Sequence, residues 1–210
     1  MTAKKGKFIT LEGGEGVGKT TNVPFIKAYL QDHHIPVVVT REPGGTQLAE
    51  KIRGLLLQNN EEALTSHTEI LLMFAARSQH LSHVIKPALE QGQWVLCDRF
   101  TDATYAYQGG GRGLSMETIS WLENLVQDDL RPDLTLLLDL PVETGMTRAK
   151  NRGGQIDRFE SEQALFFNRV KQAYLQQAQQ FPKRIKIIKA DQPLEDVQKA
   201  IAEAIKPMLL

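Results

Sequence analysis

The chain has 210 residues, of which 41% are hydrophobic and 24% charged, proportions typical of one soluble globular domain, which is expected to span residues 1–210. Its formal net charge at pH 7 is zero, so no overall field attracts nucleic acid or anionic lipid, and neither is expected as a partner. The amino terminus lacks the apolar core of a signal peptide and no apolar run approaches the ~20 residues of a membrane span, which favours a cytoplasmic protein.

Strand-like and helix-like segments alternate along the chain, which predicts an α/β fold of three layers, with a five-stranded parallel sheet covered by helices on both faces. The candidate strands are rich in Val, Leu and Ile, and comprise residues 7–12, 36–40, 93–98, 134–140 and 184–190. The candidate helices are residues 18–32, 46–58, 67–91, 115–128, 142–150, 161–180 and 193–207. Ligands of such sheets bind beyond the carboxyl ends of the strands, so residues that follow strands are the first candidates for a site.

The first predicted strand leads into Gly13-Gly14-Glu15-Gly16-Val17-Gly18-Lys19-Thr20, which opens the first predicted helix. This is the pattern G-x-x-x-x-G-K-[ST] in the strand–loop–helix context that it requires. Glycines let backbone N–H groups turn towards an anion, and the start of the helix adds further donors. Lys19 offers a mobile charge for the outer phosphates, and the Thr20 hydroxyl suits Mg²⁺. The motif predicts nucleotide binding, an ordinary glycine-rich turn being the weaker alternative.

The second predicted strand ends in Thr40-Arg41-Glu42-Pro43-Gly44-Gly45-Thr46. Its proline and glycines make a turn whatever the function of the segment. Arg41 lies at the carboxyl end of the strand, where it could be either a surface charge or a ligand-binding group. The segment alone does not decide between the two.

The predicted helix 67–91 combines an apolar face with a charged residue on that face. Apolar residues at helical spacing are Ile70, Phe74, Leu81 and Val84 or Ile85. Arg77 lies on the same face, so it is expected to extend to solvent, form a salt bridge or meet a ligand. Phe74 and Arg77 together could stack on a base and donate to its carbonyl edge. His80 and His83 are expected to be solvated rather than metal ligands, since no further ligand falls on a matching face.

The third predicted strand ends in Asp98-Arg99, and the fourth ends in Asp139. An aspartate after four apolar residues is typical of the acidic partner of a phosphate loop, which steadies Mg²⁺. Asp98 is favoured because Arg99 adds a guanidinium for a phosphate, whereas Asp139 is expected to cap the next helix. The one cysteine, Cys97, excludes an internal disulfide and is expected to be a buried strand residue.

Two later segments contain glycine next to polar side chains. Gly109, Gly110 and Gly111 predict a loop, and Thr104 and Gln108 would face the same way if the turn before it is helical. Arg148, Lys150, Arg152 and Arg158 surround Gly153-Gly154 between two predicted helices. Such a basic loop is usually a solvated surface segment, but beside a phosphate loop it is better interpreted as a lid, residues 148–160, that places arginines on a transferring phosphoryl group.

In this order, the motifs resemble those of bacterial thymidylate kinases over essentially the whole chain. The matching segments are Glu12 to Thr21, Arg41 to Thr46, Phe74 with Arg77, Asp98 to Phe100, Tyr107 to Gly113, Arg131 to Asp133, and Arg152 to Glu160. The resemblance implies a P-loop nucleoside-monophosphate-kinase fold with a lid. It also implies Mg²⁺-dependent transfer of the ATP γ-phosphoryl group to dTMP, giving dTDP and ADP in dTTP synthesis, by a homodimer.

The resemblance further implies roles for single residues. ATP would be held by Gly13, Gly14, Glu15, Gly16, Val17, Gly18, Lys19, Thr20, Thr21 and Arg148. The dTMP molecule would be bound by Glu15, Arg41, Phe74, Arg77, Arg99, Thr104, Tyr107 and Gln108. In that set Phe74 would stack on thymine, Arg77 would donate to its O4 edge, and Tyr107 would lie where a ribose 2′-hydroxyl would clash. Thr20 and Asp98 would serve the metal, and the catalytic groups would be Lys19, Asp98, Arg99, Arg152 and Arg158.

Some family members carry a catalytic arginine in the phosphate loop, directly after its acidic residue, where this chain has Gly16. The resemblance therefore implies the subclass in which lid arginines supply that charge, with Arg152 favoured over Arg158 and Arg148. Ala103 stands where a serine is common in the family. The alternatives are another monophosphate kinase, acting on dUMP, CMP or GMP, and a non-catalytic nucleotide-binding module. A GTPase switch is disfavoured because the Asp-x-x-Gly and Asn-Lys-x-Asp patterns do not occur at the required places.

Overall fold

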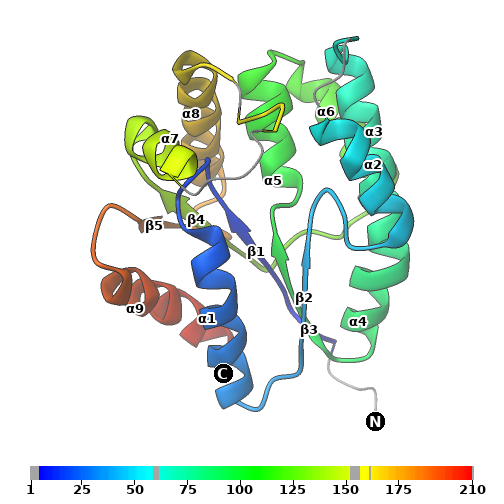
Figure 1. Ribbon diagram of the computed structural model, residues 1–210. Helices are drawn as coiled ribbons and strands as arrows, with labels where there is room; N and C mark the ends of the chain where they lie inside the picture. The colour runs from blue at the N-terminus through cyan, green and yellow to red at the C-terminus, as the bar shows by residue number, and fades with distance from the viewer. Residues whose placement is uncertain (1–4, 59–61, 152–156, 161, 210) are drawn as a thin grey trace.

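The computed structural model describes residues 5–58, 62–151, 157–160 and 162–209. Within these residues, one parallel sheet has the strand order β2-β3-β1-β4-β5. Its strands are β1 (Phe8–Glu12), β2 (Val37–Arg41), β3 (Trp94–Asp98), β4 (Leu134–Asp139) and β5 (Ile185–Lys189). Each predicted strand is confirmed to within one residue at either end. β1 lies in the middle, so the phosphate loop that follows it emerges at the centre of the sheet (Figure 1).

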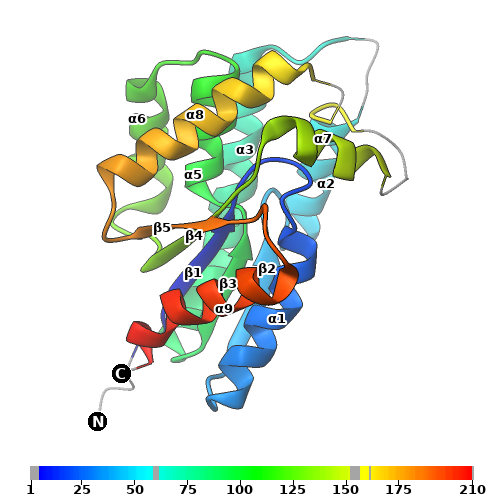
Figure 2. The same cartoon turned by 90° about the vertical axis from the view of Figure 1, so that its left-hand side faces the viewer.

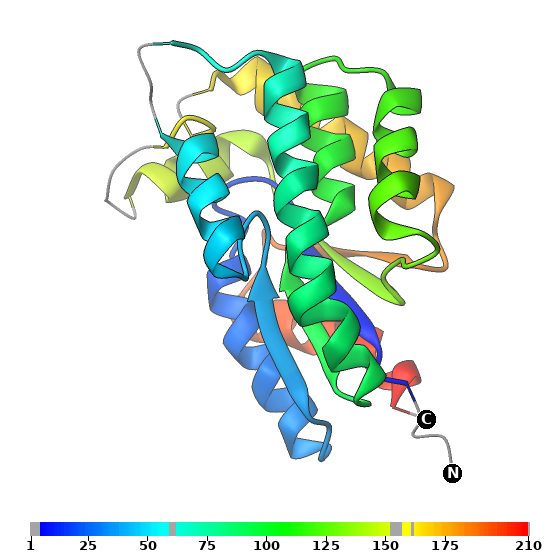
Figure 3. The same ribbon diagram turned by 90° about the vertical axis from the view of Figure 1, so that its right-hand side faces the viewer.

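Helices cover both faces of the sheet, as predicted. The larger ones are α1 (Lys19–Asp32), α2 (Gln47–Leu57), α3 (Ser66–His80), α6 (Met116–Gln127), α7 (Val142–Asn151), α8 (Ala164–Gln180) and α9 (Leu194–Ile205). Figure 2 shows α1 and α9 on one side of the sheet, and α3, α8 and the short helix α5 (Thr101–Thr104) on the other. Figure 3 shows α2 and α3 side by side, with α2 following the end of β2. A short 3-10 helix, η3 (Lys206–Met208), follows α9.

Alternate residues of the strands build the core on the two faces. On one face, Ile9 and Leu11 of β1 pack with Ile26 and Leu30 of α1 and with apolar residues of α9. On the other face, Phe8 of β1 joins a cluster that includes apolar residues of the segment 81–89, which follows α3 in the chain. This two-sided burial explains why the strands are continuous apolar runs. Cys97 of β3 lies in the second cluster and is fully buried, as predicted, and burial raises the pKa of its thiol well above the usual range.

The predicted helix 67–91 is helical throughout, but it is interrupted by a wide turn. After α3 come the π-helical turn η1 (Leu81–Ile85) and the short helix α4 (Lys86–Glu90). Pro87 lacks a backbone N–H, so the regular hydrogen bond to the residue four positions earlier cannot form, and the helix widens just before it.

The prediction of a loop at the three glycines is wrong. Residues 101–111 form α5 (Thr101–Thr104) and the π-helical segment η2 (Tyr105–Gly111), which packs against α8. A Cβ atom on Gly110 would lie 2.6 Å from the Ala173 Cβ of α8 and 3.0 Å from the Arg169 carbonyl oxygen. Glycine is therefore required for the close approach of two helices rather than for a flexible connection. In the described parts of the chain, no helix combines the length and the apolar character needed to cross a membrane.

Candidate active site

The phosphate loop has the geometry that its sequence predicts. It spans residues 13–18, between the last residue of β1 and the first of α1. Gly16 has φ +65°, and a Cβ atom there would lie 2.1 Å from the Gly145 carbonyl oxygen, so only glycine fits. Lys19 folds back over the loop and donates to the carbonyl oxygens of Gly13 (3.2 Å) and Gly14 (2.9 Å). Burial, with the nearby Arg99 cation, lowers the pKa of the Lys19 ammonium group.

A cavity of about 590 Å³, here called the loop cavity, opens in front of this loop. The residues that line it and were predicted to serve ATP or metal are Glu15, Gly16, Val17, Gly18, Lys19, Thr20, Thr21, Asp98 and Arg148. Arg99, predicted to bind the dTMP phosphate, lines it as well. Asp98 Oδ1 is buried and has no hydrogen-bond partner among the described residues. An unpaired carboxylate oxygen facing the same cavity as the Thr20 hydroxyl fits a hard cation such as Mg²⁺, which needs few protein ligands when phosphates supply the others.

A second cavity, of about 120 Å³ and here called the α3 cavity, adjoins the first. Its lining includes Glu15, Arg77, Arg99, Ala103, Thr104, Tyr107 and Gln108. Arg77 was expected to extend to solvent, form a salt bridge or meet a ligand, and the structure shows the salt bridge, in which Nε donates to Glu42 Oε2 at 2.7 Å. In addition, Nη2 donates to Thr104 Oγ1 at 2.9 Å. Nη1 is buried without a hydrogen-bond partner in the described part of the structure, so one donor of the fork remains for a ligand.

Phe74 supports Arg77 from the side of the core. The Arg77 guanidinium lies over the Phe74 ring, 4.8 Å from its centroid, and over the Phe100 ring, 5.0 Å from its centroid. Phe74 is 2% exposed and belongs to a cluster with Ile70 and residues of α6. It is absent from the described lining of the α3 cavity, so its stacking on thymine stays a prediction.

The expectation that His80 is solvated is wrong, whereas His83 is exposed as predicted. His80 is fully buried, with Nδ1 3.0 Å from Glu42 Oε1 and Nε2 2.7 Å from Thr40 Oγ1. Glu42, which precedes a cis peptide bond to Pro43, thus holds both His80 and Arg77. The histidine joins the end of β2 to α3 and keeps the carboxylate in place for the arginine.

Arg99 lies in the wall between the two cavities, since it lines both. Its Nη1 donates to the Gly13 carbonyl oxygen at 2.8 Å, and its Nη2 donates to Glu15 Oε1 at 2.7 Å. The guanidinium lies 4.7 Å from the centroid of the Tyr107 ring, whose hydroxyl also donates to Glu15 Oε1 at 2.8 Å. One cation at the end of β3 is therefore held by the phosphate loop on one side and by η2 on the other.

Sequence reasoning missed two charged residues that line both cavities, Arg53 of α2 and Asp157. Arg53 Nη1 donates to the Pro43 carbonyl oxygen at 2.9 Å. No local signal identified it, because an arginine within a helix is usually a solvated charge. Arg41, which was predicted to bind a phosphate, pairs with Glu50 at 3.0 Å and has a side chain that is 55% exposed. Among the described residues that line the two cavities, Arg41 does not occur.

The lid segment is described only in part. Arg148 of α7 lines the loop cavity, and Arg152 lies outside the described residues. Arg158 Nη2 lies 2.6 Å from Glu69 Oε2, and its Nε donates to the Leu56 carbonyl oxygen at 2.9 Å. These contacts fasten the end of the predicted lid segment to α2 and α3, beside the α3 cavity.

Comparison with known proteins identifies the family. The profile of the family described as Thymidylate kinase matches residues 11–201. The chain belongs to the thymidylate kinase family. A thymidylate kinase of Pseudomonas entomophila (strain L48) is 61% identical over 205 residues, covering 98% of this chain and 97% of the relative. That of Ectopseudomonas mendocina (strain ymp) is 58% identical over the same shares.

A solved structure agrees with this assignment. The crystal structure of thymidylate kinase from Ehrlichia chaffeensis is similar with a TM-score of 0.78 and 34% sequence identity, covering 97% of this chain and 99% of that one. The predicted family, the fold class and the enzyme class, a dTMP kinase, are confirmed.

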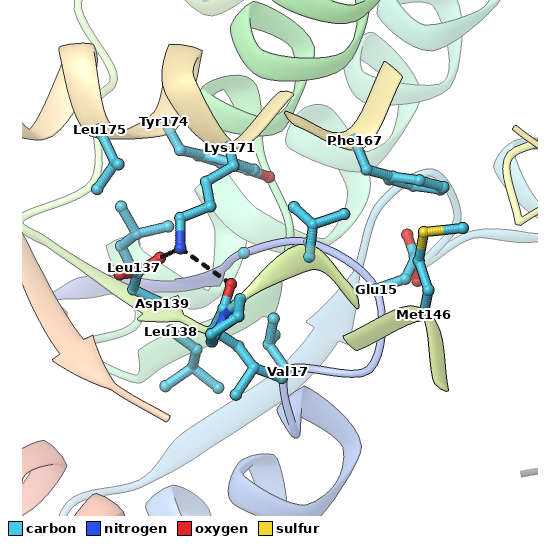
Figure 4. Close-up of a pocket in the computed structure, with 15 residues that line it drawn as sticks. Glu15, Val17, Leu137, Leu138, Asp139, Met146, Phe167, Lys171, Tyr174 and Leu175 are labelled. Atoms are coloured by element: carbon cyan, nitrogen blue, oxygen red, sulfur yellow. Dashed lines mark hydrogen bonds and ion pairs between the residues drawn. The ribbon is translucent and has the colours of Figure 1, made fainter. Parts of the chain in front are cut away.

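Behind the phosphate loop, a third cavity of about 30 Å³ lies between the loop, the β4–α7 connection and α8 (Figure 4). Lys171 of α8 closes it, with Nζ 2.7 Å from Asp139 Oδ1 and 3.0 Å from the Leu140 carbonyl oxygen. The expectation that Asp139 caps the next helix is wrong: α7 begins at Val142, directly after Pro141. Asp139 instead fixes α8 to the end of β4.

Proposed function

We propose that the loop cavity holds the phosphates of ATP and that the α3 cavity holds dTMP, with phosphoryl transfer across the wall between them. The observation that carries this proposal is the position of Arg99, which lines both cavities. A phosphate oxygen of dTMP attacks the γ-phosphorus in line and needs no strong base, because it is already ionised. Two polyanions repel each other, so the catalytic task of the protein is to neutralise and align them.

On the donor side, the loop amides and Lys19 hold the outer phosphates of ATP. Thr20 and Asp98 hold Mg²⁺, which neutralises phosphate charge when it is bound. The unpaired Asp98 oxygen supports this assignment. The interactions of Lys19 with Gly13 and Gly14 are exchanged for phosphate oxygens, which are better acceptors for a cation.

On the acceptor side, Arg77 donates to the O4 edge of thymine, with Thr104 and Gln108 in the same pocket. The lining of the α3 cavity supports this placement, because the polar side chains of these three residues all line it. Arg99 and Arg41 bind the dTMP phosphate, which requires Arg41 to exchange Glu50 for the ligand. Phe74 stacks on the base, and Tyr107 excludes a 2′-hydroxyl.

For the lid, we propose the subclass with lid arginines, in which Arg152 stabilises the transferring phosphoryl group. The phosphate loop supports this, since it has Gly16 directly after Glu15. Arg158 is the second choice because its guanidinium is bound to Glu69. We further propose a single domain, residues 1–210, and a cytoplasmic homodimer joined through the exposed apolar side chains of α3 and α6, among them Leu71, Trp121 and Leu125.

A coupled assay of ADP release, with Mg-ATP and a panel of nucleoside monophosphates, tests the proposal. We expect dTMP to give the highest kcat/KM, and GMP and CMP to be poor acceptors. Brisk turnover of a purine acceptor without turnover of dTMP would refute it. Omitting Mg²⁺ and adding a chelator should abolish ADP release, which tests the metal separately.

A further inference from the structure

Tyr174 of α8 reaches the rear of the phosphate loop and is not itself a cavity residue of the two proposed substrate sites. Its side chain is 3% exposed, and it is absent from the described linings of the loop cavity and the α3 cavity. Figure 4 shows it beside Lys171 and Leu175, directed from α8 towards the loop. Its hydroxyl donates to Glu12 Oε2 at 2.8 Å and accepts from Arg99 Nη1 at 3.3 Å. The phenol therefore links a buried carboxyl group to the arginine in the shared wall.

Glu12, the last residue of β1, is fully buried and acts on the same arginine through the backbone. Its Oε1 accepts from the Phe100 backbone N–H at 2.7 Å. Arg99 directly precedes Phe100 and has φ +66°, a backbone conformation that residues other than glycine rarely adopt. Such a conformation needs support from neighbouring groups. Burial, together with the nearby Asp102 carboxylate, raises the pKa of Glu12 to about 8. Burying such a group costs free energy, so its retention calls for a role.

We propose that Glu12 and Tyr174 are positioning residues for Arg99, holding its backbone and its guanidinium where both substrates reach it. Gly13 and Glu15 anchor Arg99 from the loop, and the Tyr107 ring covers one face. The Tyr174 hydroxyl accepts a further hydrogen bond from Arg99 and so holds the guanidinium from the side of α8, a contact that the loop alone does not provide. An arginine side chain carries about 2 kcal/mol of rotamer entropy, so orienting it in advance strengthens the binding of a phosphate.

The test measures dTMP affinity by calorimetry in Tyr174→Phe, which keeps the ring and removes the hydroxyl. We expect affinity for dTMP to fall about 5- to 10-fold, as for the loss of one hydrogen bond. The matched control is Tyr105→Phe, because the Tyr105 hydroxyl donates to a different buried carboxylate, Glu123 Oε2, at 2.6 Å. That control should leave dTMP affinity unchanged. Unchanged affinity in Tyr174→Phe, or an equal loss in both variants, would overturn the proposal.

A double-mutant cycle separates positioning from general loss of structure. In an Arg99→Lys background, Tyr174→Phe should cause no further loss of dTMP affinity, since its effect acts through Arg99. An undiminished further loss would refute the inference. If Tyr174→Phe does not fold, Glu12→Gln takes its place in the same cycle, with the same expected result.

The inference rests on the proposed acceptor site, and the two fail differently. A wild-type enzyme that does not phosphorylate dTMP refutes the proposed function. An active wild-type enzyme whose Tyr174→Phe variant binds dTMP normally refutes only the role of Tyr174.

Discussion

The Arg158 guanidinium is paired with the Glu69 carboxylate at 2.6 Å, which joins the end of the lid segment to α3. Glu69 is 1% exposed, lies 3.3 Å from Arg112 Nε, and accepts from Gln108 Nε2 at 2.7 Å. One buried anion thus connects the lid, the η2 helix and a residue of the α3 cavity. In this arrangement Arg158 is a structural cation, which predicts different consequences for the two lid arginines.

Arg152→Ala should lower kcat about 10³-fold, as for other arginines that stabilise phosphoryl transfer, with a modest change in the KM for dTMP. Arg158→Ala removes one of the cations that pair with the buried Glu69 carboxylate. We therefore expect a loss of about 1–3 kcal/mol in the free energy of unfolding and a smaller loss of kcat. Steady-state kinetics and urea unfolding of both variants measure these effects. A near-normal kcat in Arg152→Ala, with the large loss in Arg158→Ala, would reverse the assignment.

Arg77→Lys should weaken dTMP binding about 10- to 100-fold. Lysine keeps a positive charge near Glu42 but loses the planar fork whose third nitrogen, Nη1, has no protein partner among the described residues. The matched control is Arg131→Lys, at an arginine 2.6 Å from Glu123 and remote from both cavities. Isothermal titration with dTMP measures the effect. Equal affinities in Arg77→Lys and the wild type would show that Nη1 does not meet the base.

Gly110→Ala should destabilise the fold by about 1–3 kcal/mol, because the new Cβ would lie 2.6 Å from the Ala173 Cβ. Gly54, in the middle of α2, is exposed and has no other atom within 4 Å of the site of a Cβ. Gly54→Ala should therefore stabilise the protein by about 0.5–1 kcal/mol, since alanine favours a helix. If η2 is packed as described, urea unfolding of the two variants gives changes of opposite sign in the free energy of unfolding. Two stabilising substitutions would indicate a flexible glycine loop after all.

Glu12→Gln should change how stability depends on pH. The pKa of Glu12 rises from 4.5 to about 8 on folding, so the unfolded chain releases this proton first as the pH increases. The stabilising contribution of the protonated group is complete below pH 4.5 and is lost as the pH rises to about 8. At about 1.36 kcal/mol per pKa unit, the variant should gain up to about 5 kcal/mol relative to the wild type across this interval. Urea unfolding at pH 5, 6.5 and 8 checks this, and a constant difference would contradict it.

Features with local causes were predictable from the sequence. The strand limits follow from apolar runs, and the phosphate loop follows from a motif whose glycines and lysine lie within eight residues. The features that were predicted wrongly depend on partners that are distant in the sequence. His80 is buried because Thr40 and Glu42 lie beside it, and Asp139 faces Lys171 rather than its own helix. The glycines of η2 looked like a loop because their reason, the surface of α8, lies about 60 residues further along the chain.

The common wall also bears on how the two substrates influence each other. A nucleotide that draws Arg99 towards one cavity alters the charge and shape presented to the other. By thermodynamic reciprocity, the factor by which ATP changes the dissociation constant of dTMP must equal the factor by which dTMP changes that of ATP. With the substrates placed as proposed, Arg99 alone would couple donor and acceptor, without any motion of the sheet.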